Sequence, residues 1–193
     1  MRKTLFALIS YAFVATFSSC DKDEIIVSNS QKYAFESNDF GFGRGGLTLV
    51  GDYLYIGTSS GGSDAGATAN YFFKFDKQLN KVWQYSLGHY EVMGNASLDA
   101  SGNIYFIADT IHPSHTWVSD NFKLYSLDNN GNFRWSKSLG WGQRDEDGAK
   151  NIAIAADNTI YAGVSNLSAF DTDGNILWTY ADAGSHISAP IID

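Results

Sequence analysis

The same short segment occurs three times in this chain of 193 residues, and its spacing restricts the fold more than any other feature of the sequence. In each copy an aspartate stands seven residues before a tryptophan: FDKQLNKVW (75–83), LDNNGNFRW (127–135) and FDTDGNILW (170–178). The tryptophans are 52 and 43 residues apart. This spacing is typical of a four-stranded propeller blade and is too long for leucine-rich or paired-helix repeats of about 20–34 residues. The repeat therefore predicts a propeller built from blades.

A second segment precedes each copy and predicts a β-hairpin. It has an apolar stretch, a tight polar turn and another apolar stretch that ends in tyrosine: GGLTLVGDYLY (45–55), NASLDASGNIY (95–105) and NIAIAADNTIY (151–161). A third strand is expected at 71–75, 122–127 and 167–170, followed by the aspartate turn and a fourth strand with the tryptophan. Gly131 and Gly174 supply the positive φ that this turn favours, whereas Leu79 replaces glycine in the first copy. We predict an all-β fold, a β-propeller of four-stranded antiparallel blades.

This pattern resembles the PQQ-like, or quinoprotein alcohol dehydrogenase-like, β-propeller repeat. The resemblance rests on aromatic/Leu-Asp-x-x-Gly-Asn-x-x-Trp, followed by an Ala/Ser-rich strand and a Gly-Asn-x-Tyr hairpin, and it covers residues 45–193. It implies a non-enzymatic scaffold, similar in architecture to a lipoprotein that assists outer-membrane barrel assembly. The implied ligand is a hairpin edge or exposed loop of a partner protein. The alternative is part of a larger propeller enzyme, quinone-dependent or glycan-active, whose site lies mainly in other blades.

The chain supplies about three blades and the start of a fourth. The three blades occupy residues 45–180, and residues 185–193 resemble the beginning of another hairpin. Propellers close with about four to eight blades, so this arc is expected to be an open, incomplete ring. The segment KYAFES (32–37) precedes the first hairpin, where the fourth strand of a blade would lie. We expect this strand to have no partner in this chain. We interpret the chain as an N-terminal fragment of a longer propeller. The alternative is a naturally short arc, whose bare strand edges would invite aggregation.

Residues 1–19 have the organisation of a bacterial lipoprotein signal peptide. Arg2 and Lys3 precede an apolar run at 5–17, and two serines then precede Cys20, the single cysteine of the chain. We expect Cys20 to carry lipid and to become the mature N-terminus. The alternative is a plain signal peptide with an incidental cysteine.

The charged residues after Cys20 bear on location and partners. Residues 20–31 are predicted to form a lipidated polar tether, and 32–193 the partial propeller domain. The acidic segment at 21–24 resembles a surface-export signal of some lipoproteins and an inner-membrane retention signal of others, and a solvated tether would also need charge. We expect a lipid anchor in the outer membrane, with the protein at the cell surface or in the periplasm. The formal charge is −8, and it becomes −10 without Arg2 and Lys3, so we expect no nucleic acid as a partner.

No catalytic set of side chains stands out from the repeat. Quinone-dependent enzymes of the resembled family bind calcium and cofactor through carboxylates and amides, and many have adjacent cysteines, whereas this chain has one cysteine. Asp145 and Asp147 lie in an acidic loop that faintly resembles a calcium loop and are weak metal candidates. His112 and His115 lack a third ligand nearby in sequence. We expect no catalytic residue and no cofactor, with calcium or PQQ as the alternatives.

The lengths of the connections predict which face binds a partner. If the strands alternate in direction, turns after strands one and three lie on one face, and connections after strands two and four lie on the other. Every long connection falls in the second set: 59–70, 87–94, 109–120, 140–150 and 181–186. Two tryptophans outside the repeat are expected in these loops, where a large apolar ring often marks a contact surface.

We therefore predict a face that binds an unknown protein or glycan, with contacts centred on Tyr90, His115, Trp117, Trp141 and Arg144. The alternative is that the face has no binding role and that its loops became long by neutral insertions, which exposed loops tolerate.

Overall fold

The computed structural model describes residues 5–8, 32–35, 46–58, 70–110, 118–143 and 152–181. The chain divides into two compact units, Met1–Asn38 and Asp39–Asp193. No helix in the described part of the chain is long and apolar enough to cross a membrane.

The first unit contains one pair of antiparallel strands, β1 (Leu5–Leu8) and β2 (Lys32–Phe35). The prediction of a strand at 32–37 is confirmed for its first four residues. The prediction that this strand has no partner in the chain is wrong, because its edge pairs with β1. An exposed strand edge gains hydrogen bonds from any extended segment that can reach it.

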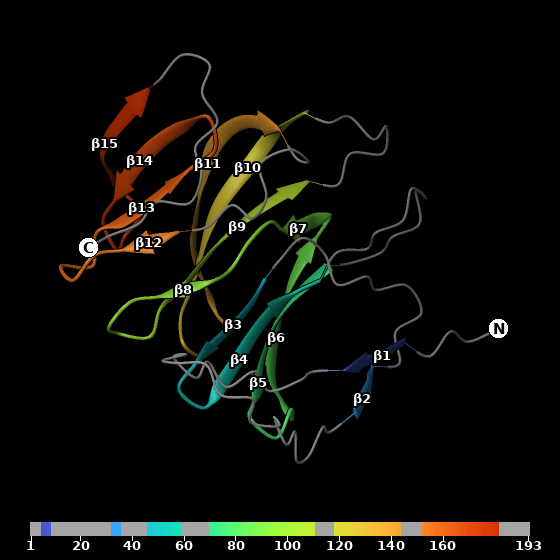
Figure 1. Cartoon of the computed structure of the whole chain (residues 1–193). Helices are drawn as coiled ribbons and strands as arrows, with labels where there is room; N and C mark the ends of the chain where they lie inside the picture. The colour runs from blue at the N-terminus through green and yellow to red at the C-terminus, as the bar shows by residue number, and fades with distance from the viewer. Residues whose placement is uncertain are drawn as a thin grey trace, which may run out of the picture. The chain divides into compact units, whose positions relative to one another are not determined.

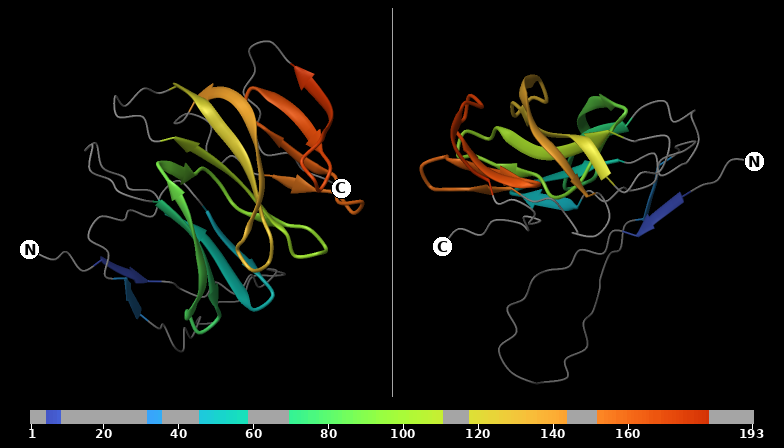
Figure 2. Two further views of the ribbon diagram at one scale, coloured as in Figure 1. Left: turned by 180° about the vertical axis from the view of Figure 1, so that it is seen from behind. Right: turned by 90° about the horizontal axis from the view of Figure 1, so that it is seen from above.

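The second unit contains three four-stranded antiparallel sheets, which we call blades 1, 2 and 3 (Figures 1 and 2). Blade 1 has the order β3 (Leu47–Val50), β4 (Tyr53–Gly57), β5 (Asn70–Asp76), β6 (Lys81–Gly88). In blade 2 the first strand is split into β7 (Tyr90–Val92) and β8 (Ser97–Leu98); both pair with β9 (Ile104–Thr110), and β10 (Val118–Leu127) and β11 (Phe133–Gln143) follow. Blade 3 has the order β12 (Ala153–Ile154), β13 (Ile160–Gly163), β14 (Asn166–Phe170), β15 (Ile176–Ala181). The predicted all-β fold with tryptophan-bearing fourth strands is confirmed, and the three blades form an open arc.

All five predicted loops overlap strands, and two of them do so around a glycine with positive φ. The expected loop 87–94 contains the end of β6 and all of β7, and the expected loop 140–150 begins with the last residues of β11. Glycines with positive φ let the backbone bend at these points. At Gly88 (59°) the chain leaves β6 of blade 1 for β7 of blade 2, and at Gly140 (83°) the ladder of β10 and β11 continues past a register shift. Tyr90 and Trp141 were predicted in loops; this is wrong for both, since Tyr90 lies in β7 and Trp141 in β11.

One five-residue turn recurs at five places in the blades. Its first residue donates its backbone N–H to the carbonyl of the fifth, and the fourth donates to the carbonyl of the first. In four copies the side chain of the first residue, aspartate, also accepts hydrogen bonds from backbone and side chain of the fifth, asparagine. These copies are Asp76–Asn80, Asp99–Asn103, Asp128–Asn132 and Asp171–Asn175; the remaining one is Ala155–Thr159. Leu79 adopts a φ of 63° at the fourth position, so the first copy forms the turn without glycine.

The aspartate turns predict a loss of stability in acid. Hydrogen bonds from the terminal asparagine are the main reason why the pKa of Asp76, Asp128 and Asp171 lies below its usual 3.8. A pKa lowered by folding stabilises the protein above the unfolded-state pKa, and that stability is lost as pH falls through the folded-state pKa. We expect melting temperatures to fall below about pH 4. The triple Asp→Asn variant should show a shallower fall in circular-dichroism melts from pH 6 to 2, and equal slopes would contradict the prediction.

The core lies between neighbouring blades, because each sheet is apolar on both sides. Along β9, Ile104, Phe106 and Ala108 face blade 1, while Tyr105 and Ile107 face blade 3. All five side chains are fully buried, as the alternation of a strand between two packed sheets requires. Phe72 of blade 1 stacks on Phe106 with ring centroids 4.3 Å apart. Blade 2 is therefore stabilised by two interfaces, one with each neighbour.

Candidate interaction face

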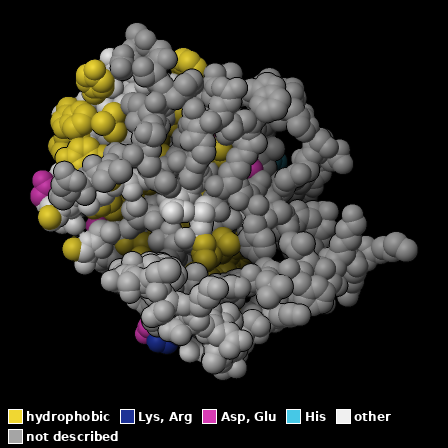
Figure 3. Space-filling model, viewed as in Figure 1, with side chains coloured by type: hydrophobic (Ala, Val, Ile, Leu, Met, Phe, Trp, Pro, Cys, Tyr) yellow, Lys and Arg dark blue, Asp and Glu magenta, His cyan; other side chains and the backbone are white. Residues whose placement is uncertain are grey.

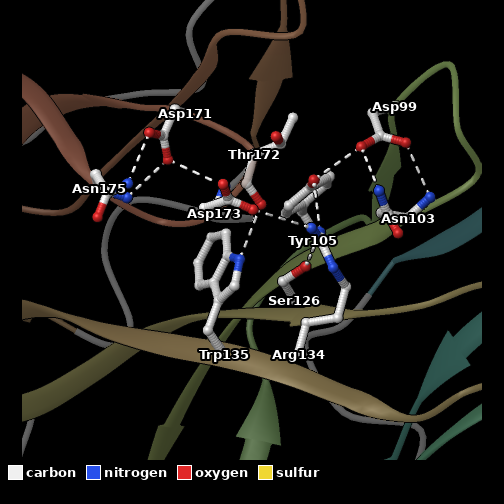
Figure 4. Close-up of polar contacts among 10 residues, drawn as sticks. All are labelled: Asp99, Asn103, Tyr105, Ser126, Arg134, Trp135, Asp171, Thr172, Asp173 and Asn175. Atoms are coloured by element: carbon white, nitrogen blue, oxygen red, sulfur yellow. Dashed lines mark hydrogen bonds and ion pairs between the residues drawn. The ribbon is translucent and has the colours of Figure 1, made fainter.

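The tryptophans of the repeat connect successive blades. The indole N–H of Trp83 donates to the carbonyl of Asn129 in the aspartate turn of blade 2 (3.1 Å). Trp135 makes the same contact with Thr172 in the turn of blade 3 (2.9 Å; Figure 4). A Cβ atom at Gly131 would lie 2.7 Å from Trp83, and one at Gly174 2.8 Å from Trp135. Glycine is needed at both positions because the indole of the preceding blade lies against it.

A polar network joins blade 2 to blade 3 beneath this contact (Figure 4). The Tyr105 hydroxyl donates to Asp99 (2.8 Å) and accepts from Arg134 (3.1 Å), which also donates to Ser126 (3.0 Å). Arg134 lies 3.8 Å from Asp173 in the turn of blade 3. Burial, and next the hydrogen bond to Asp99, raises the pKa of Tyr105 to about 12. Burial raises the pKa of Asp99, but its hydrogen bonds together outweigh burial and lower it.

The network has a structural role. Tyr105 is fully buried, and its hydroxyl holds Arg134 in place by accepting a hydrogen bond from the guanidinium. The prediction from sequence missed the network, although one signal was present. Asp99 stands six residues before Tyr105, where the other hairpins have Leu49 and Ala155.

The face with the aspartate turns uses its polar groups internally. At the interface of blades 1 and 2, the buried Lys74 donates to the Asn129 side chain (2.6 Å) and lies 4.0 Å from the ring centre of Tyr53. Burial lowers the pKa of Lys74. Between blades 2 and 3, Arg134 likewise reaches from one blade to the aspartate turn of the next, where it lies 3.8 Å from Asp173. Lys74 and Arg134 are therefore both engaged within the fold, and the turns next to them are closed by their own hydrogen bonds.

The structure describes two of the predicted binding residues, and their environments differ. Tyr90 is half-buried, packs edge-on against Tyr125 (5.9 Å) and has the Lys123 ammonium 4.8 Å from its ring centre. Both contacts lie within blade 2, and the ring also packs against the buried cluster that blades 1 and 2 share. Trp141 is 53% exposed and its carbonyl accepts a hydrogen bond from Ser165 of blade 3. The other predicted residues lie outside the described part of the chain: Cys20, His115, Trp117, Arg144, Asp145 and Asp147.

Buried polar side chains lie near the same face as Trp141. Asn70 begins β5, and Glu91 and Asp109 are directly paired across β7 and β9. All three are at least nine-tenths buried, and each has an interaction partner. Within the described residues, no group of three histidine, cysteine, aspartate or glutamate side chains could hold a metal ion. The sequence prediction missed these residues because nothing in the repeat distinguishes them.

Three four-stranded antiparallel sheets that pack face to face through a recurring tryptophan contact define a β-propeller repeat protein. No protein-family model matches the chain, and no curated protein matches it. Among solved structures, the chain is similar to BamB from Moraxella catarrhalis, with 21% identity and a TM-score of 0.52. The match covers 78% of this chain and 39% of that one, so the chain spans about two fifths of the BamB structure. This similarity confirms the predicted β-propeller fold.

Two other solved structures are similar at lower scores. A protein of unknown function from Bacteroides caccae has 10% identity and a TM-score of 0.43, with 84% of this chain and 53% of that chain covered. The calcium-binding protein regucalcin from Agrobacterium tumefaciens has 17% identity and a TM-score of 0.39, with 72% and 45% covered.

Proposed function

We propose that this protein is a lipid-anchored lipoprotein of the bacterial envelope whose non-enzymatic propeller binds a partner protein through its long-loop face. We define the long-loop face as the ends of the blades that carry the connections after strands two and four. The difference between the two faces carries the proposal. Turns on the opposite face have at most five residues, whereas the β4–β5 connection on the long-loop face spans residues 58–69.

Chemistry supports the same choice of face. The aspartate turns hold the carboxylate of their first residue and the donors of their fifth, asparagine, in internal hydrogen bonds, so these groups are already engaged within the fold. On the long-loop face, Trp141 exposes 53% of its surface at the end of β11. Tryptophan is enriched among the residues that dominate protein interfaces, because its large ring buries much surface at little entropic cost.

A photo-crosslinking experiment tests the choice of face. A photoreactive phenylalanine is placed at Trp141 or, as a control, at exposed Gln78 in an aspartate turn, and the full-length protein is irradiated in intact cells. We expect a discrete partner adduct from position 141 and none from position 78. Trp117→Ala with Trp141→Ala should weaken partner binding at least tenfold and leave the melting temperature within a few degrees. Adducts mainly from position 78, or unfolding of the double variant, would contradict the proposal.

Lipid at Cys20 would hold this scaffold at the membrane. The proposal follows from the basic, apolar and small-residue order of residues 1–20. One acyl chain gives only marginal anchoring, so we expect two or three chains. After feeding with radiolabelled fatty acid, wild-type protein should carry label in the membrane fraction, and Cys20→Ser protein should carry none. Equal label in both proteins would rule the anchor out.

The binding role requires no cofactor, and we propose that none is bound, calcium and PQQ included. We also propose that further blades complete the ring in the full-length protein. The support for this is the apolar outer side of blade 3, where Trp178 is 45% exposed and Tyr180 61% exposed. A propeller enzyme with its site in those further blades is the competing function.

A further inference from the structure

The chain bends at a glycine in the same place of blades 1 and 2, and then continues differently. Gly88 and Gly140 each stand five residues after the tryptophan of the repeat, and both have a positive φ. Beyond Gly88 the chain enters blade 2, where β7 pairs with the last three residues of β9, 108–110. Beyond Gly140 it stays in its own blade, where β11 runs on to Gln143 and pairs with β10. The described part of blade 3 therefore has no strand that corresponds to β7.

This difference follows from the second strand of blade 3. The strands β9 and β13 begin at the same position of the repeat, at Ile104 and Ile160. However, β9 has seven residues, whereas β13 has four and ends at Gly163. Only Val164 and Ser165 separate its end from β14. The backbone edge that β7 uses in blade 2 is thus missing in blade 3, and the end of β11 is held there in another way.

Two contacts hold the end of β11 on this two-residue β13–β14 connection. The Ser165 hydroxyl donates to the Trp141 carbonyl (2.5 Å). Gly142 is buried, and a Cβ atom there would overlap Cγ1 of Val164 and lie 3.3 Å from the Phe122 ring. The φ of Gly142 lies outside the left-handed region, so glycine is needed at this position for space and not for its conformation. Val164 and Phe122 belong to the core between blades 2 and 3, which leaves them little room to move aside.

These contacts fix the backbone of Trp141, while its side chain remains 53% exposed. Hydrophobic side chains also gather where β13–β15 lie (Figure 3), but those of β15 belong to the outer side of blade 3, whereas Trp141 lies at the end of β11. A group whose backbone is ordered before binding loses less conformational entropy when a partner arrives. Trp141 therefore has the geometry of a contact residue that is pre-ordered by the neighbouring blade.

We propose that Ser165 and Gly142 are positioning residues, which hold the end of β11 on the β13–β14 connection and so fix the place where Trp141 meets a partner protein. They act through Trp141 and do not themselves touch the partner. The partner-binding part rests on the proposed function of the long-loop face. The docking of β11 on blade 3 rests only on the contacts described above.

Two matched pairs of variants of the full-length protein test the docking. Gly142→Ala introduces the clash, and Val164→Ala added to it removes the methyl group that the new Cβ meets. Ser165→Val removes the hydroxyl, whereas Ser165→Thr keeps it in a side chain of the same shape. Hydrogen exchange followed by mass spectrometry measures how often the segment 138–143 opens.

We expect exchange in this segment to be at least tenfold faster in Gly142→Ala and in Ser165→Val than in wild type. The double variant with Val164→Ala, and Ser165→Thr, should match wild type, and exchange in β9 should be the same in all proteins. Wild-type rates in both Gly142→Ala and Ser165→Val would overturn the proposal, because β11 would then be held without either contact.

Crosslinking separates the positioning role from the binding role. The photoreactive phenylalanine at position 141 is combined with each of the four changes. We expect the partner adduct to fall at least fivefold with Gly142→Ala and with Ser165→Val, and to return with the added Val164→Ala and with Ser165→Thr. Equal adducts in all variants would overturn the positioning role and leave the binding face intact. No adduct from position 141 in any background would refute the proposed function and the positioning role with it, while hydrogen exchange would still decide the docking.

Discussion

Replacing Trp135 with alanine should lower the free energy of unfolding by about 3–5 kcal/mol, the range of large-to-small aromatic deletions in protein cores. The indole packs on Tyr105 at 5.8 Å and closes over Gly174 of blade 3. It also donates the hydrogen bond that the Thr172 carbonyl accepts. The alanine variant loses the ring, the bond and the contact between two blades together. Urea unfolding followed by circular dichroism measures the change.

Trp178→Ala is the matched control, because it removes the same side chain from the same position of the repeat. No described residue of a following blade covers Trp178, which is 45% exposed, and it keeps only the contact with its own blade. Partly exposed side chains with few partners contribute about 1 kcal/mol or less. Equal losses for the two variants would show that the tryptophan acts within its blade and that the contact with the next turn adds nothing.

The fold could be predicted from the sequence because its defining interactions are local. The carboxylate of Asp128 accepts hydrogen bonds from Asn130 and Asn132, so the five-residue turn has a fixed pattern that recurs in the printed sequence. The tryptophan seven residues later marks the fourth strand in all three blades. Short-range patterns of this kind predict the strands and their order within a blade.

Contacts between blades were harder to predict, because they join residues about 30 to 60 positions apart and depend on how two sheets pack. Nothing in the sequence near Phe72 indicates that its ring would stack on Phe106 in blade 2. The bond from Trp135 to the carbonyl of Thr172 likewise forms only after two sheets have packed. For the candidate site, the face remains a prediction from connection lengths, and the sequence could not tell that Tyr90 packs against the core and that Trp141 is exposed.

Replacing Gly131 with alanine should destabilise the protein by about 2–5 kcal/mol, through two costs that act at one atom. The φ of Gly131 is 82°, a conformation that costs a residue with a Cβ atom about 1–2 kcal/mol. The new Cβ would also lie 2.7 Å from the indole of Trp83, and overpacking of this kind costs about 1–3 kcal/mol. The Trp83 ring can move away only by breaking its bond to Asn129.

Two further variants separate these costs. In the Trp83→Ala background the clash is gone, so Gly131→Ala should cost only about 1–2 kcal/mol, the backbone contribution. Leu79→Gly, at the equivalent position with a φ of 63° and no indole from a preceding described blade, should change stability by about 1 kcal/mol at most. If Gly131→Ala costs the same with and without Trp83, the glycine is required by the turn alone.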